Sequence, residues 1–237
     1  MKVIYAQSPM YRKLEYNVLT QIAEIDGKRF VLKKALNEQA IPFVNGLEKN
    51  YQEMVKQYGV EHVAKGELLS PGIFKMEYIY GESFDMRCMQ YFKIGDFDGF
   101  IQNIVYYYQH MLADYTNDVL SVKDFDPMSP QRKYNIDLSF NNIIFSSNSG
   151  KFKIIDYEWL LPSVSRKLAC FRAITLLYEQ YQFWFQKKEM TWEMLLSGCG
   201  LEKEDIELCI EQGKIFYSSV LDLATKRIEK ATVMVNL

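Results

Sequence analysis

Hydrophobic and polar positions alternate in the first third of the chain and then follow helical spacing. Five short apolar or semi-alternating runs predict strands: 3–5, 16–25, 29–34, 63–69 and 73–80. The Asp26-Gly27 pair between the second and third runs predicts a tight hairpin turn. Apolar positions three and four residues apart predict a helix over about 37–58, and Gly59 is expected to end it.

Helical spacing dominates after residue 80. Helices are predicted at about 98–115, 165–186, 190–197 and 202–225. Two apolar segments around the turn Ser147-Asn148-Ser149-Gly150 predict a strand–turn–strand unit over 142–157, and Gly81-Glu82-Ser83 is interpreted as a short connection. The pattern therefore predicts an α+β fold, with a small β-rich lobe and one helix in residues 1–80 and a larger helical lobe in residues 81–237.

Charge, hydropathy and cysteine content argue against several classes of function. The chain has 237 residues, a net charge of −2 and a pI near 5.8, so no overall positive field favours nucleic acid or an anionic membrane. The sequence contains no signal-peptide pattern and no apolar run long enough to span a bilayer, so a cytoplasmic location is expected. Four scattered cysteines and two histidines do not form a zinc-binding pattern. The oligomeric state stays open.

Three polar residues at the ends of apolar segments carry the candidate chemistry. Asp137 and Asn142 precede the buried run 143–145, and Asp156 follows the apolar pair 154–155. A carboxylate beside a buried strand is costly unless a metal ion or a partner compensates its charge. Phosphoryl transfer from a nucleotide needs Mg²⁺ with oxygen ligands and a group that orients the acceptor hydroxyl. This spacing favours Asp137 as the catalytic base, with Asn142 and Asp156 as metal ligands.

The two segments resemble motifs of the protein-kinase-like superfamily. Asn135-Ile-Asp-Leu-Ser-Phe-Asn-Asn142 is similar to its catalytic loop, and Ile155-Asp-Tyr-Glu158 to its metal loop. The form of the second motif resembles the small-molecule branch, which contains aminoglycoside phosphotransferases and choline/ethanolamine kinases, and also kinase-like domains found beside bacterial glycan-assembly enzymes. The resemblance implies a bilobal fold, ATP and Mg²⁺ as cofactors, and a hydroxyl of a small molecule, sugar or glycan as acceptor.

The same resemblance implies nucleotide-binding residues in the first lobe. Lys33, in Phe30-Val-Leu-Lys33, matches the lysine that holds the α- and β-phosphates. Glu48 on the following helix is preferred over Glu53 as the partner of Lys33. The segment 76–79 resembles the hinge, so backbone groups of Glu77 and Ile79 are expected to bind the adenine edge. A solvated lysine at a strand end and an ordinary strand exit are the alternatives.

Two departures from the family pattern keep a second function open. No glycine-rich phosphate loop is present in residues 7–13, where Ser8, Arg12 or Lys13 would have to contact phosphate and a solvated basic turn is the simpler interpretation. Asn135 replaces the loop histidine, although an asparagine can still donate and accept hydrogen bonds. The alternative is therefore a pseudokinase that binds a nucleotide or a partner. A Ser/Thr protein kinase is disfavoured because little chain separates Asp156 from the next helix.

Two more features have a structural and a functional interpretation. Arg172 lies in an apolar helical segment and is expected to form an ion pair with a loop carboxylate or to bind an anionic substrate. The tyrosines 106–108 are expected to pack in a helical core, with a sugar-binding surface as the alternative.

Overall fold

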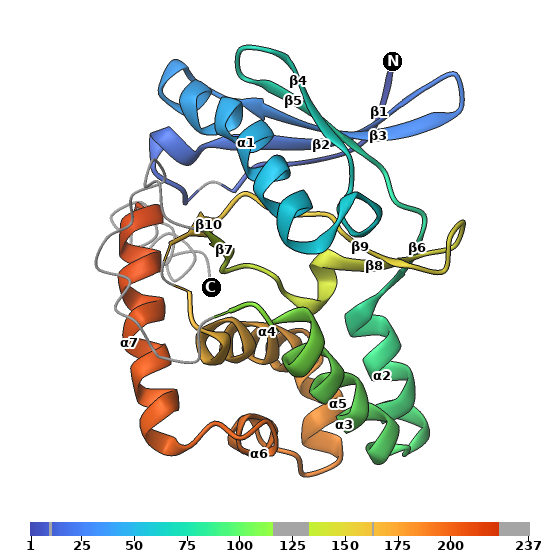
Figure 1. Ribbon diagram of the computed structural model, residues 1–237, viewed down its shortest axis with the longest axis vertical. Helices are drawn as coiled ribbons and strands as arrows, with labels where there is room; N and C mark the ends of the chain where they lie inside the picture. The colour runs from blue at the N-terminus through green and yellow to red at the C-terminus, as the bar shows by residue number, and fades with distance from the viewer. Residues whose placement is uncertain (10, 116–132, 163, 223–237) are drawn as a thin grey trace, which may run out of the picture. The chain divides into compact units, whose positions relative to one another are not determined.

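The computed structural model describes residues 1–9, 11–115, 133–162 and 164–222. The chain forms two compact units (Figure 1). Of the described residues, the first unit contains those in 1–52, 64–78 and 214–222, and the second contains those in 53–63 and 79–213. The predicted α+β architecture, with one antiparallel-sheet part and one mainly helical part, is confirmed. The lobe boundary at residue 80 stays a prediction.

The first unit is built on a five-stranded antiparallel sheet. Its strands are β1 (Lys2–Gln7), β2 (Val18–Ile25), β3 (Lys28–Ala35), β4 (Gly66–Ser70) and β5 (Ile73–Glu77), in the order β1-β2-β3-β5-β4. All five lie where the alternating pattern predicts strands. The β2–β3 hairpin turns through Asp26 and Gly27, whose φ angles of 51° and 73° are those of a tight turn that matches strand twist.

One helix, α1 (Ile41–Tyr58), follows β3. The apolar positions whose spacing predicted this helix include Val44, Leu47 and Met54, and all three side chains are buried. The predicted start at residue 37 corresponds to a capping turn, because the Asn37 side-chain oxygen accepts a hydrogen bond from the Ala40 N–H at 3.1 Å. The helix ends at Gly59, which has a φ of 87° and donates its N–H to the Val55 carbonyl at 2.8 Å.

The second unit is mainly helical. Its helices are α2 (Phe84–Ile94), α3 (Phe97–Tyr106), α4 (Arg166–Gln180), α5 (Gln182–Lys187), α6 (Trp192–Gly198) and the first part of α7 (Lys203–Val220). The helix predicted at 98–115 continues beyond α3 as a wider π-type turn over Tyr107–Met111. The helix predicted at 165–186 is divided at Tyr181, whose ψ of 23° is not helical. Of the helix predicted at 202–225, residues 223–225 lie outside the described residues.

Two small sheets position the polar loops of the second unit. The first contains β6 (Gly81–Ser83), β8 (Ile143–Ser146) and β9 (Phe152–Ile154), and the second pairs β7 (Tyr134–Asn135) with β10 (Leu160–Leu161). The predicted strand–turn–strand unit is thus confirmed as β8 and β9. The interpretation of residues 81–83 as a mere connection was wrong, because they pair with β8. A Cβ atom at Gly81 would collide with the Phe145 carbonyl, so glycine permits this close pairing.

Within the described ranges, no helix has the length and apolar character needed to cross a membrane. The cytoplasmic location stays a prediction.

Candidate functional site

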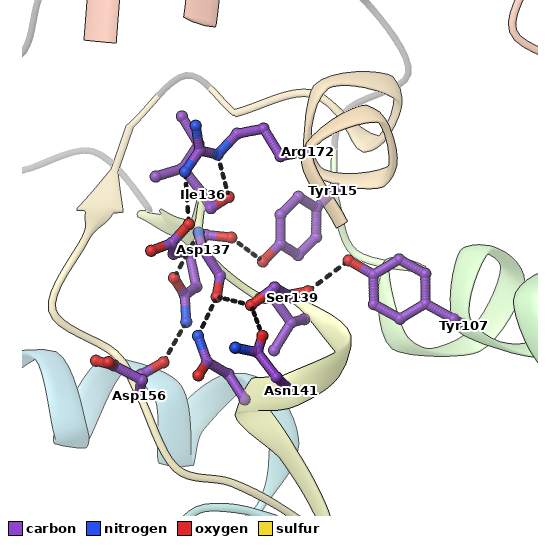
Figure 2. A network of polar contacts seen from close by, with 11 residues as sticks. Tyr107, Tyr115, Ile136, Asp137, Ser139, Asn141, Asp156 and Arg172 are labelled. Carbon is purple, nitrogen blue, oxygen red and sulfur yellow. Dashed lines mark hydrogen bonds and ion pairs between the residues drawn. The ribbon is translucent and has the colours of Figure 1, made fainter. Parts of the chain in front are cut away.

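The two motifs that the sequence singles out lie side by side in the second unit (Figure 2). Asn135 in β7 pairs with Leu160 in β10, and the Ile136 N–H donates to the Trp159 carbonyl at 3.0 Å. Further along, the Ile155 N–H donates to the Asn142 carbonyl at 3.0 Å. Backbone hydrogen bonds therefore join the loop 135–142 to the loop 155–159 at both ends.

Asn135, which replaces the family's histidine, links the two loops through its side chain. It is fully buried, its Oδ1 accepts the Asp137 N–H at 2.9 Å, and its Nδ2 donates to the Asp156 carbonyl at 2.7 Å. Both polar atoms of the amide are thus used, and they fix the backbone beside each of the two aspartates. The expectation that an asparagine at this position can both donate and accept hydrogen bonds agrees with this geometry.

Arg172 on α4 holds the Asp137 carboxylate (Figure 2). Its Nη2 lies 2.6 Å from Asp137 Oδ1, and its Nε donates to the Ile136 carbonyl at 3.2 Å. The arginine is buried, whereas 28% of the Asp137 side chain is exposed. Among the described residues Asp137 Oδ2 has no hydrogen-bond partner, so one carboxylate oxygen is anchored and the other is available. The expected ion pair of Arg172 with a loop carboxylate is confirmed.

The predicted metal ligands offer oxygen atoms from both loops. Asn142 donates its Nδ2 to the Asp137 carbonyl at 2.9 Å, so its amide oxygen is the atom left for a cation. Asp156 is half-buried, and its Oδ1 accepts the Glu158 N–H at 3.2 Å. In the described part of the chain, no cluster of three or more acidic, histidine or cysteine ligands exists. Two oxygen donors suit Mg²⁺, which keeps several waters and binds substrate phosphates.

Two buried tyrosines complete the support of the loop 135–142, and the sequence analysis did not identify this role. Tyr107 donates its hydroxyl to the Leu138 carbonyl at 2.6 Å, and Tyr115 donates to the Asn135 carbonyl at 2.8 Å. Burial raises the pKa of both phenols well above the ordinary value of 10.0, so both remain hydrogen-bond donors at neutral pH. Helical spacing indicates that Tyr107 is buried, but it contains no signal for the carbonyl that the hydroxyl meets.

Lys33 lies inside the sheet of the first unit. It is buried in β3, where its neighbours across the sheet are Thr20 and Phe74. Lys34 points to the other face of the strand and is more exposed. The alternative of a solvated lysine at a strand end therefore does not describe Lys33, although its role toward a nucleotide stays a prediction.

The other predicted nucleotide-binding groups are less clearly arranged. Glu48 is exposed on α1 and forms no ion pair within the described residues, while Glu53 pairs with Lys56 at 2.8 Å. The Glu77 N–H donates to the Lys65 carbonyl at 2.8 Å, so a hydrogen bond from Glu77 to adenine would have to use its carbonyl. The chain passes from the first unit to the second just before Ile79. These roles stay predictions.

The basic turn at residues 11–13 is joined to the end of α7, inside the first unit. The Lys13 N–H donates to the Val220 carbonyl at 2.9 Å, and the Asp222 N–H donates to the Tyr11 carbonyl at 2.8 Å. These backbone bonds fix the segment in which the family pattern has a glycine-rich loop. Contacts of Ser8, Arg12 or Lys13 with phosphate stay untested.

No family model and no curated protein sequence matches this chain. Similar solved structures include the choline kinase LicA from Streptococcus pneumoniae, with 17% identity and a TM-score of 0.41 over 80% of this chain and 76% of that chain. A macrolide 2'-phosphotransferase type I matches with 8% identity and a TM-score of 0.44, over 90% and 85% of the two chains. The Rio2 kinase of Chaetomium thermophilum, in a complex with ADP, Mg²⁺ and phosphoaspartate, matches with 13% identity and a TM-score of 0.45, over 90% and 72%.

Proposed function

We propose that this chain is an ATP- and Mg²⁺-dependent phosphotransferase that phosphorylates a hydroxyl group of a small molecule, sugar or glycan. The observation that carries the proposal is the state of Asp137. One of its carboxylate oxygens is held by Arg172 and the other has no hydrogen-bond partner among the described residues. A carboxylate that is anchored on one side and partly exposed on the other can accept the proton of an acceptor hydroxyl.

The proposed division of roles follows from this arrangement. Asp137 orients the acceptor hydroxyl and takes its proton. The side-chain oxygens of Asn142 and Asp156 hold Mg²⁺, with the buried Glu158 as an additional candidate ligand. When bound, the metal ion neutralises charge on the phosphates as the phosphoryl group is transferred.

The first unit and Ile79, the residue at which the chain enters the second unit, supply the remaining groups of the proposal. Lys33 holds the non-transferred phosphates, and Glu48 pairs with Lys33. The carbonyl of Glu77 and the backbone of Ile79 contact the adenine edge. Each of these roles is testable by itself, since a substitution in the first unit leaves the hydrogen bonds around Asp137 in place.

Asn135 bears on the alternative function, a pseudokinase that binds without catalysing. One argument for that alternative was the missing loop histidine. The side chain of Asn135 bonds the Asp137 N–H in its own loop and the Asp156 carbonyl in the neighbouring loop, which supports the proposal that the loop is functional without the histidine. The absence of a glycine-rich loop from residues 7–13 remains in favour of the alternative.

The test separates binding from catalysis. ATP binding is measured by calorimetry with and without Mg²⁺, and ADP formation is measured with a panel of amino alcohols, monosaccharides and oligosaccharides. Asp137→Asn is expected to retain ATP binding and to lose ADP formation by about 10²–10⁴-fold, the range of general acid–base catalysis. Asp98→Asn, an exposed change on α3, is the matched control.

Each outcome has one meaning. Absence of ATP binding under all conditions removes the phosphotransferase proposal. ATP binding with equal residual turnover in wild type and Asp137→Asn supports the pseudokinase. Asp156→Asn is expected to abolish the gain in ATP affinity that Mg²⁺ gives, and an unchanged gain would refute its assignment as a metal ligand.

A further inference from the structure

A pocket of about 290 Å³ opens in the second unit among α2, α3 and β8, elements that Figure 1 labels. Its lining residues are Phe84, Arg87, Gln102, Asn103, Tyr106 and Phe145. None of them takes part in the proposed phosphotransfer chemistry. The volume lies near the lower end of the range for small-molecule sites, which is enough for a ligand with one ring.

Arg87 gives the pocket a positive charge. Its guanidinium carbon lies 4.5 Å from the centre of the Phe145 ring, and among the described residues no carboxylate pairs with it. A guanidinium group that rests on an aromatic face keeps the N–H groups at its edge for in-plane contacts. Those edge groups match the two oxygens of a carboxylate or the oxygens of a phosphate.

The remaining walls combine amides with an aromatic face. Asn103 donates its Nδ2 to the Gly99 carbonyl at 2.7 Å, which fixes the amide, while Gln102 is exposed. Tyr106 is 43% exposed and packs against His110 at 5.0 Å between ring centres. The amides can bond hydroxyl or carbonyl groups of a ligand, and the ring of Tyr106 offers a surface for a flat apolar face.

The floor of the pocket is preformed. Phe84 is fully buried and packs against Phe140 and Phe145, with ring centres 5.2 and 5.7 Å away. The first pair is edge-to-face and the second is tilted, and this packing fixes the rings in a dense core, so a ligand would not have to open the pocket. The pocket therefore combines a rigid apolar floor with the cation of Arg87, which pairs with no carboxylate among the described residues. This combination favours ligands that have both an apolar face and an anionic group.

We propose that this pocket binds a small single-ring compound that carries a carboxylate or a phosphate group. The anionic group of the ligand pairs with the N–H groups at the edge of the Arg87 guanidinium. The ring of the ligand lies against the ring of Tyr106, and its polar substituents form hydrogen bonds with Gln102 and Asn103. The proposal does not rest on phosphotransfer, because it uses none of the residues assigned to that chemistry.

Three probes test the pocket: benzoate, phenyl phosphate and glucuronate. Binding to the full chain is measured by saturation-transfer NMR and calorimetry, with benzyl alcohol and benzylamine as the neutral and cationic comparisons. At least one anion is expected to bind in about the millimolar range, more tightly than either comparison. Preference for benzoate, for phenyl phosphate or for glucuronate identifies an aromatic acid, a phosphate ester or a sugar acid as the natural class.

Substitutions at Arg87 and Lys93 test whether the anionic probe binds in this pocket. Arg87→Gln is expected to weaken the preferred anion about 10-fold and to leave benzyl alcohol unchanged, because a charge-assisted bidentate contact is lost. Lys93→Gln is the matched control on α2, since Lys93 lies over Trp184, outside the pocket. Arg87→Lys keeps the charge and should retain part of the affinity.

Two results would overturn the proposal: no binding of any anionic probe, or equal affinity of the preferred anion for wild type and Arg87→Gln. If Arg87→Gln does not fold, the exposed change Gln102→Ala carries the same test, and it should weaken the preferred anion a few-fold. Asp156→Asn should bind the probe as wild type does, and a changed affinity in that variant would place the probe at the phosphotransfer site instead.

Discussion

The loop around Asp137 and the helix around Glu48 both carry a predicted functional carboxylate, but they differ in how that carboxylate is held. Asp137 receives a buried arginine from α4, and its backbone N–H and carbonyl bond to Asn135 and Asn142. Glu48 is exposed and forms no ion pair among the described residues. The difference teaches that a short motif predicts how its own backbone is held, here by Asn135 and Asn142, whereas the partner of a carboxylate lies in another element and follows only from the fold.

The largest effect is expected at Arg172. Arg172→Met removes the guanidinium that pairs with Asp137 and bonds the Ile136 carbonyl, at nearly constant side-chain volume. Breaking a buried ion pair from one side costs about 3–5 kcal/mol, and we expect about 2–4 kcal/mol here because Asp137 is partly solvated. The free energy of unfolding in urea measures the loss.

Arg166→Met is the control for Arg172. It also removes an arginine of α4, but one that bonds the Leu112 and Ala113 carbonyls and pairs with no carboxylate among the described residues. A loss in Arg172→Met no larger than in this control would mean that the loop does not depend on the ion pair.

The next effect is expected at Asn135. Asn135→Ala removes the hydrogen bonds that its buried side chain makes to the Asp137 N–H and the Asp156 carbonyl, and each lost bond in this part-buried site costs about 1–3 kcal/mol. Asn135→His should recover most of the stability, since an imidazole ring can also donate and accept. The measurement is the unfolding free energy, with Asn141→Ala, an exposed loop change, as control. A histidine variant as unstable as the alanine variant would contradict the proposed role.

A smaller effect is expected at the two loop tyrosines. Tyr107→Phe and Tyr115→Phe each remove one hydroxyl and leave a carbonyl unpaired, at a cost of about 1–2 kcal/mol. Tyr106→Phe is the control on the same helix, because no hydrogen bond of its hydroxyl is found among the described residues. Equal unfolding free energies for all three variants would show that the tyrosine hydroxyls do not support the loop.

The same tyrosines predict how stability depends on pH. Burial raises the pKa of each phenol in the folded state above the unfolded value, so the folded state holds its protons more tightly. The stability that this linkage contributes is complete below about pH 10 and is lost as the pH rises beyond it. Unfolding followed from about pH 8 to 12 should show a steeper loss in wild type than in the double phenylalanine variant.

The strands, the helices and the polar residues of the two motifs could be predicted because they are local. Alternation, helical spacing and the Asp26-Gly27 turn each act within a few residues. Arg172 and Asp137 are 35 residues apart, and only the fold brings them together. The pairing of residues 81–83 with β8 was missed because the two strands are far apart in the sequence. In addition, a three-residue segment is too short to show the alternation that predicts a strand.

The substitution Glu48→Gln is expected to have the smallest effect. It tests most directly the comparison between the carboxylates of Asp137 and Glu48. If it pairs with Lys33 when a nucleotide is bound, the pair is exposed on one side and is worth about 0–1 kcal/mol, so Glu48→Gln should weaken ATP·Mg²⁺ binding by up to about fivefold. Glu53→Gln, whose carboxylate already pairs with Lys56, is the matched control on α1. Calorimetry gives both dissociation constants. Equal dissociation constants for the two variants would mean that Glu48 is not the partner of Lys33. The reason is that only the loss of a carboxylate that contacts Lys33 in the nucleotide-bound state should weaken ATP·Mg²⁺ binding.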